Sequence, residues 1–352
     1  MNQPDNFPSL GSVRTGLGPE SIDLDPAGRR GFVCCPRSNS VTFFNMDSLE
    51  AVGDVPVGKE PIALTYDRQS NRVFTTDARS ATVTVIDADA MKPIKTIPVE
   101  LYPAGATCYP QRRKIYVGNT GSGTVSIIDA DTMDVVNTVP ARRAAGSLAV
   151  DTIRDLVYCA NFGDASVTII DGATNEPLGE IAVDYAPCKI VVDGPRARAY
   201  VAGSLSSIVT IIDLEKRTAI GTIPVERAPV GMALGRGGDR IYAVNRGVGT
   251  VSVIDRESSK EWARVPVGCA PGDLSVDQAT GTLYVSDAAS NTVSVFQDRL
   301  DHRPKNLPRD TRHPLVGKPL PDFALPEATT GEERTKAEWQ GKPYIINFFA
   351  SW

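Results

Sequence analysis

Histidine is almost missing from this chain of 352 residues, which contains only His302 and His313. Both lie in a segment rich in proline and charged residues, so the sequence offers no Ser-His-Asp triad and no zinc site with Cys/His spacing. A P-loop and a Gly-x-Gly-x-x-Gly motif before a helix are also missing, and GRGGDR at residues 235–240 is interpreted as a hairpin turn. We therefore expect no cofactor and no catalytic site of these kinds.

Long apolar runs and a basic or apolar N-terminal segment are lacking as well. No run approaches the roughly 18 apolar residues that span a bilayer, and the opening MNQPDNFPSLGSVRT contains no signal peptide. We expect no membrane span and a cytoplasmic location, or a periplasmic or extracellular one if a leader has been removed. The net charge of −5 gives no reason to expect nucleic acid as a partner, and the six cysteines do not form a disulfide scaffold.

What the sequence does contain is a repeat of 42 residues. The segment SVTFFN at residues 40–45 returns as TVTVID, TVSIID, SVTIID, IVTIID, TVSVID and TVSVFQ, and each copy starts 42 residues after the last. An aromatic residue recurs in the same register at Phe32, Phe74, Tyr116, Tyr158, Tyr200, Tyr242 and Tyr284. Within each copy, turn residues separate four short runs with a period of two. Four strands per copy predict an all-β fold, a seven-bladed β-propeller over residues 10–300.

The seventh copy lacks its fourth strand, because TVSVFQ is followed by DRLDHRPKNLPRD. Residues 11–15 stand one period before residues 53–57, which are the fourth strand of the first copy. We therefore predict that the N-terminal segment supplies the outer strand of blade seven and closes the ring, which removes two exposed sheet edges. Residues 301–314 are the predicted linker to whatever follows.

Two strand pairs of the repeat point to a family. YVGN before TVSIID and YAVN before TVSVID resemble the YVTN-type propeller repeat. The resemblance implies the fold and says little about function, because one propeller architecture serves binding proteins, scaffolds, lyases and lactonases.

The composition changes after the linker. Residues 315–352 contain GKPLPDF and GKPYIINFFASW, which resemble the opening of thioredoxin-like redoxins of the TlpA and AhpC/TSA kind. In that family a Cys-x-x-Cys motif or one peroxidatic cysteine follows, at a helix N-terminus that lowers the thiol pKa. The resemblance implies an incomplete thioredoxin-like α/β segment whose catalytic cysteine is expected after Trp352, so that this chain alone would be inactive as a redoxin. A C-terminal tail that only looks redoxin-like is the alternative.

Ligands of propellers bind where the loops of all blades converge. The loop that enters the first strand of a blade and the turn after its second strand share this face, the mouth. Seven cations fall there and predict a site for an anionic small molecule or an acidic protein segment: Arg37, Lys59, Arg79, Arg143, Lys189, Arg227 and Arg246. Four carboxylates oppose them, and ordinary solvated loops are the alternative: Glu20, Glu60, Asp164 and Asp273.

The cysteines fall into two groups when the copies are aligned. Cys34, Cys108 and Cys159 align with apolar or small residues and are predicted to be buried. Cys35 replaces Asp, Asn or Gly in the turn after the second strand, whereas Cys188 and Cys269 fall in loops that enter a first strand. Because blades one and seven adjoin, Cys35 and Cys269 could form a thiol pair or, with Cys188, a soft-metal site. Unpaired surface cysteines are the alternative.

Three functions stay open on these grounds. The chain could be a ligand- or protein-binding propeller attached to a thiol-disulfide oxidoreductase, a binding propeller without catalysis, or a lyase or lactonase that acts through its mouth. We expect a monomer in each case.

Overall fold

The computed structural model describes residues 6–299, 324–326 and 333–335. Contacts divide the chain into two units, Met1–Arg303 and Pro304–Trp352. In the second unit the described residues form one antiparallel pair, β29 (Ala324–Pro326) with β30 (Glu333–Thr335). The predicted linker and most of the predicted redoxin segment therefore lie outside the described residues.

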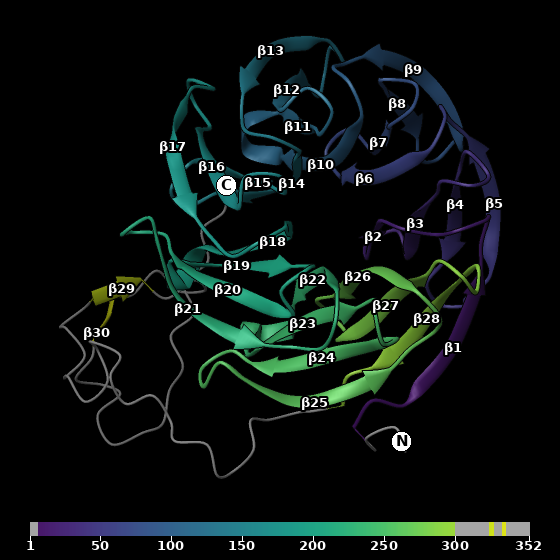
Figure 1. Cartoon of the computed structure of the whole chain (residues 1–352). Helices are drawn as coiled ribbons and strands as arrows, with labels where there is room; N and C mark the ends of the chain where they lie inside the picture. The colour runs from purple at the N-terminus through teal and green to yellow at the C-terminus, as the bar shows by residue number, and fades with distance from the viewer. Residues whose placement is uncertain (1–5, 300–323, 327–332, 336–352) are drawn as a thin grey trace. The chain divides into compact units, whose positions relative to one another are not determined.

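The described part of the first unit is a ring of seven four-stranded antiparallel sheets (Figure 1). In chain order, the strands of blades one to three are β2 (Ile22–Asp25), β3 (Arg30–Cys35), β4 (Ser40–Asn45), β5 (Ala51–Pro56), β6 (Pro61–Asp67), β7 (Arg72–Asp77), β8 (Thr82–Asp87), β9 (Lys92–Pro98), β10 (Pro103–Tyr109), β11 (Lys114–Asn119), β12 (Thr124–Asp129) and β13 (Val135–Pro140). Each blade runs from its innermost strand to its outermost strand in chain order.

Blades four to six follow the same order. Their strands are β14 (Ala145–Asp151), β15 (Leu156–Asn161), β16 (Ser166–Asp171), β17 (Pro177–Ala182), β18 (Pro187–Asp193), β19 (Arg198–Gly203), β20 (Ile208–Asp213), β21 (Thr218–Pro224), β22 (Pro229–Leu234), β23 (Arg240–Asn245), β24 (Thr250–Asp255) and β25 (Lys260–Pro266). Short 3-10 helices connect the first two strands of blades three, five and six: η1 (Pro110–Arg112), η2 (Gly194–Arg196) and η3 (Arg236–Gly238). The last of these occupies the predicted hairpin at residues 235–240.

Blade seven joins the two ends of the ring. It contains β26 (Pro271–Asp277), β27 (Thr282–Asp287) and β28 (Thr292–Gln297), and its outer strand is β1 (Ser9–Arg14). The β1 strand pairs antiparallel with β28, from Ser9 opposite Phe296 to Arg14 opposite Thr292. Figure 1 shows β1, in purple, beside β28 on the outside of the ring. Both the sevenfold architecture and the closing N-terminal strand are therefore confirmed.

Apolar clusters fill the spaces between the blades, one between each blade and the next. The cluster between blades seven and one contains Val13 of β1 together with Phe44 and Tyr284. The predicted aromatic column is buried in all seven blades. Because both faces of a sheet are covered by neighbouring blades, the second and third strands are apolar at consecutive positions.

The residue that ends the second strand is buried in every blade, although it is polar in most of them. Asn119 donates from Nδ2 to Thr124 Oγ1 over 3.1 Å and to Ser126 Oγ over 2.9 Å. Asp77 accepts the equivalent hydrogen bonds from the hydroxyls of Thr82 and Thr84. Residues at this position are polar because their side chains form hydrogen bonds with the next strand, as a buried polar group requires, and not because they face water.

The prediction that Cys35 lies in the turn after the second strand is therefore wrong. Cys35 is the last residue of β3, is fully buried, and takes the place of this Asp or Asn column. Its Sγ lies 3.4 Å from Thr42 Oγ1. A thiol is small and weakly polar, so it fits the same buried position.

Candidate functional site

Two cavities of about 690 Å³ each lie in the first unit. The first, the central channel, is lined by residues of all seven innermost strands. The second, the mouth pocket, is lined by loops of blades one and two and by one arginine of blade six: Glu20, Pro36, Arg37, Asn39, Lys59, Glu60, Ile62, Arg79 and Arg246. Glu20, Ile62 and Arg246 line both cavities, so they lie where the pocket meets the channel.

The structure brings together four of the seven cations predicted for the mouth. Arg37, Lys59, Arg79 and Arg246 all line the mouth pocket. Three others lie elsewhere: Arg143 and Arg227 are exposed on the loops of blades four and six, and Lys189 lies in β18 and lines the central channel.

Hydrogen bonds donated by backbone amides hold the loop that enters each blade against the turn after its second strand. In blade two, the Arg79 amide donates to the Lys59 carbonyl over 3.1 Å, and the Lys59 amide donates to Ser80 Oγ over 2.8 Å. The Glu60 amide donates to Asn39 Oδ1 of blade one over 2.9 Å. These bonds place the cations of blades one and two around one pocket.

The side chain of Arg37, which lines the pocket, packs against Gly18. Gly18 has a φ of +68°, and a Cβ added to it would lie 3.2 Å from both Cγ and Cδ of Arg37. A larger residue at position 18 would be strained at this φ and would press on the stem of Arg37. Gly18 therefore leaves room for the stem of Arg37 beside the loop.

Two carboxylates neutralise two of the four pocket cations. Glu20 forms an ion pair with Arg246, and Glu60 forms one with Arg79. Burial raises the pKa of Glu20, and the Arg246 guanidinium offsets this only in part. No carboxylate of residues 6–299 pairs with Arg37 or Lys59. The mouth pocket therefore carries two uncompensated positive charges.

The central channel differs from the pocket because its lysine is already paired with a carboxylate. Lys189 Nζ lies 2.7 Å from Asp273 Oδ2, which joins blade five to blade seven. Asp23 accepts from the amides of Leu24, over 2.8 Å, and of Tyr66, over 2.9 Å, and burial raises its pKa. We interpret these groups as contacts that hold the innermost strands together.

The three cysteines considered for a thiol or metal site are placed differently from one another. Cys35 is buried, and burial raises its pKa. Cys188 lies inside β18 rather than in the loop before it, with its Sγ 3.1 Å from the Pro229 carbonyl oxygen, and burial raises its pKa to about 11. Cys269 is exposed.

All six cysteines lie within residues 6–299, and all are free thiols. Cys34 and Cys159 are buried as predicted. Cys108 is partly exposed and lines the central channel, so the prediction that it is buried holds only in part. In the part of the chain that the structure describes, no group of three or more His, Cys, Asp or Glu residues could hold a metal ion.

An exposed apolar surface lies on the same face as the pocket and was missed by the sequence analysis. We call it the apolar rim; it consists of Leu101, Tyr102, Phe162, Tyr185, Leu205 and Val248. All six lie in blades three to six, in the loops that are equivalent to those of Lys59 and Arg79 in blade two. Comparing these loops by their equivalent positions would have shown that Leu101 and Tyr185 replace Lys59 in blades three and five, and that Leu205 replaces Arg79 in blade five.

The described residues contain no helix with both the length and the apolar character needed to cross a bilayer.

Comparison with known proteins supports the fold alone. No family model matches the sequence, and a search of curated proteins found no match. Among solved structures, a chain of Kuenenia stuttgartiensis hydrazine synthase is similar, with a TM-score of 0.74 and 21% sequence identity. The similarity covers 82% of this chain and 98% of that chain. At this identity it supports the propeller architecture and says nothing about activity.

Proposed function

We propose that this propeller is a binding module whose mouth pocket holds the anionic group of a small molecule or an acidic protein segment. The observation that carries the proposal is the pair of uncompensated cations, Arg37 and Lys59, beside Arg246 in one pocket. The Glu20 carboxylate already forms an ion pair with Arg246 there. A ligand carboxylate or phosphate would add charge-assisted hydrogen bonds of the same kind.

Calorimetric titration with citrate tests this proposal. We expect citrate to bind, and binding to weaken about tenfold in Arg37→Ala and in Lys59→Ala, since a hydrogen bond to a charged group contributes about 1.5–3 kcal/mol. Binding should also weaken as ionic strength rises. Lys92→Ala, which removes an exposed cation of β9, is the matched control and should leave the affinity unchanged. Equal affinities of all four proteins would refute the proposal.

The C-terminal segment and the family are part of the proposal. We propose that residues 315–352 begin a thioredoxin-like redoxin and that the propeller presents its ligand to this thiol-disulfide oxidoreductase. The support is the pair of motifs GKPLPDF and GKPYIINFFASW, and YVGN and YAVN support the YVTN-type repeat. A cysteine encoded within about four codons after Trp352 is the expected result, because in the redoxins that this segment resembles the active-site cysteine follows the Ala-Ser-Trp sequence. A stop codon or an unrelated sequence there contradicts it. The lyase or lactonase alternative has no specific observation in its favour.

A further inference from the structure

Three residues of the apolar rim are largely exposed. Leu101, Tyr185 and Leu205 expose 63%, 62% and 66% of their surface. Single exposed apolar residues are common on protein surfaces, whereas several of them on one face beside a charged pocket favour an interaction site. Since blades three to six each contribute at least one residue, the rim follows the mouth over more than half of the ring.

The outer strands provide a comparison within the same chain. Val52 of β5 and Ile94 of β9 are also exposed, but they occupy equivalent positions in separate blades and face outward, one per blade. Their exposure follows from the repeat, so no ligand is needed to explain it. The rim follows the repeat only in part: Leu101 and Tyr185 are equivalent to the exposed Leu17 of blade one, but the same position is Lys59, Arg143 or Arg227 in other blades.

The rim is continuous with the mouth pocket. Tyr102 donates its hydroxyl hydrogen to Glu60 Oε1 over 3.1 Å, and Glu60 lines the pocket. Farther along, the Phe162 amide donates to the Ala144 carbonyl over 3.1 Å, which seats this rim residue beside Arg143 of the same blade. Apolar and cationic side chains therefore share one face.

We infer that the mouth face binds an acidic polypeptide segment that also carries large apolar side chains. Its carboxylates would meet Arg37 and Lys59 in the mouth pocket, and its apolar side chains would cover Tyr102, Tyr185 and Leu205. This inference rests on the proposed function, because it names the class of ligand that the same pocket takes. The positive charge of the pocket favours an acidic partner. A small anion would fill the pocket alone, whereas a polypeptide would also cover the rim, so the rim favours a polypeptide.

Fluorescence anisotropy with three labelled peptides of equal length tests this inference. One peptide alternates Glu with Leu and Phe, the second replaces its apolar residues by Ser, and the third replaces its Glu by Gln. We expect the first to bind at least about tenfold more tightly than the other two, which corresponds to about 1.4 kcal/mol. Citrate should compete with its binding.

Two sets of variants separate the rim from the pocket. Tyr185→Ser combined with Leu205→Ser should weaken binding of the first peptide about tenfold and leave citrate affinity unchanged. Val52→Ser combined with Ile94→Ser is the matched control and should change neither affinity. Arg37→Glu combined with Lys59→Glu should weaken both ligands.

Each contrary outcome has a separate meaning. If the first two peptides bind equally and the rim variant changes nothing, the inference is overturned while the pocket remains an anion site. If the Gln peptide binds as tightly as the Glu peptide, the partner is apolar rather than acidic, and the inference is again overturned. If the charge-reversal variant leaves citrate affinity unchanged, the proposed function itself fails.

Discussion

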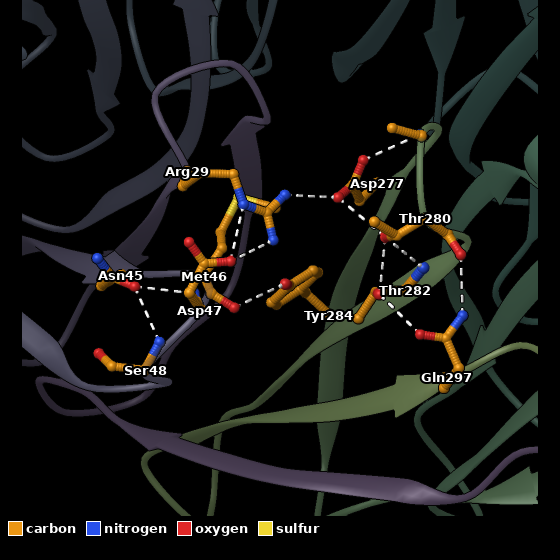
Figure 2. Close-up of polar contacts among 11 residues, drawn as sticks. Arg29, Asn45, Met46, Asp47, Ser48, Asp277, Thr280, Thr282, Tyr284 and Gln297 are labelled. Carbon is orange, nitrogen blue, oxygen red and sulfur yellow. Dashed lines mark hydrogen bonds and ion pairs between the residues drawn. The ribbon is translucent and has the colours of Figure 1, made fainter.

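Arg29 of blade one donates from Nη1 to Asp277 Oδ2 of blade seven over 2.9 Å, across the interface that closes the ring (Figure 2). The same guanidinium donates from Nε to Asp47 Oδ1 over 2.9 Å. Tyr284 crosses the same interface and donates to the Met46 carbonyl over 3.4 Å. The closing interface therefore has polar contacts in addition to its apolar cluster.

The same arrangement occurs at an interface inside the chain. Arg113 follows Arg29 by two repeats, and its Nη1 donates to Asp67 Oδ2 over 2.8 Å while its Nε donates to Asp131. Asp67 and Asp277 are both fully buried. The ring thus closes with the contact that also joins blades two and three.

We predict that Arg29→Ala lowers the free energy of unfolding by about 1–3 kcal/mol, because it leaves the buried Asp277 carboxylate without its ionic partner. Burial alone would raise the pKa of Asp277, but hydrogen bonds from Arg29, the Ala279 amide and the Thr280 hydroxyl outweigh it and lower the pKa. The stabilising effect is therefore present above about pH 4 and is lost as the pH falls through the lowered pKa. Urea denaturation of wild type, Arg29→Ala and the matched Arg113→Ala at pH 7 measures it. An unchanged midpoint in Arg29→Ala would show that the contact contributes nothing.

We predict that stability falls as the pH rises from 4 to 7 because of two buried carboxyl groups. Burial raises the pKa of both Asp77 and Asp287 to about 6. A carboxyl group whose pKa is raised in the folded state stabilises the fold below its unfolded pKa of about 4, and this contribution is lost as the pH rises through 6. The loss is on the order of 1–3 kcal/mol for each group.

The chain itself supplies the variant that tests this prediction. Asn119, Asn161 and Asn245 occupy the same position in other blades, so Asp77→Asn should be accepted there. We expect Asp77→Asn to be more stable than wild type at pH 8 and the difference to shrink at pH 4. Thermal denaturation across this range measures it, and a difference that does not change with pH contradicts the assignment.

We predict that Glu20→Gln tightens the binding of citrate several-fold. Glu20 occupies Arg246 in the free protein, and removing its charge leaves Arg246 free for a ligand carboxylate. Calorimetry of both proteins at pH 8, where citrate is fully ionised, checks this statement. Weaker binding in Glu20→Gln would show that the carboxylate helps to hold the ligand.

We predict that one thiol of the native protein reacts rapidly with a disulfide reagent such as dithionitrobenzoate at pH 8. Cys269 is exposed, whereas burial raises the pKa of Cys108 to about 12 and of Cys188 to about 11, and the thiolate is the reactive form. Cys269→Ser should abolish the fast phase, and the other thiols should react after unfolding. Two fast thiols would contradict the placement of the cysteines.

The repeat explains why the fold could be predicted and parts of the site could not. A strict period fixes which positions share a column, so blade number, strand order and the role of residues 11–15 follow from sequence. Aligning the repeats does not show what a polar residue bonds to. Asp and Asn are common in turns and therefore predict a turn at the position of Cys35, whereas in this protein they end the second strand and bond to the third. Contacts between non-adjacent blades, such as Lys189 with Asp273, depend on ring geometry, which the repeat alone does not supply.

The antiparallel pairing of β1 with β28 continues just past both strands. The Gln297 amide donates to the Pro8 carbonyl and the Arg299 amide donates to the Asn6 carbonyl, each over 3.0 Å, so positions 6 and 299 lie next to one another. In a protein limited to residues 6–299, a short peptide bridge between these positions would allow a circular permutant whose new ends lie between two strands of another blade.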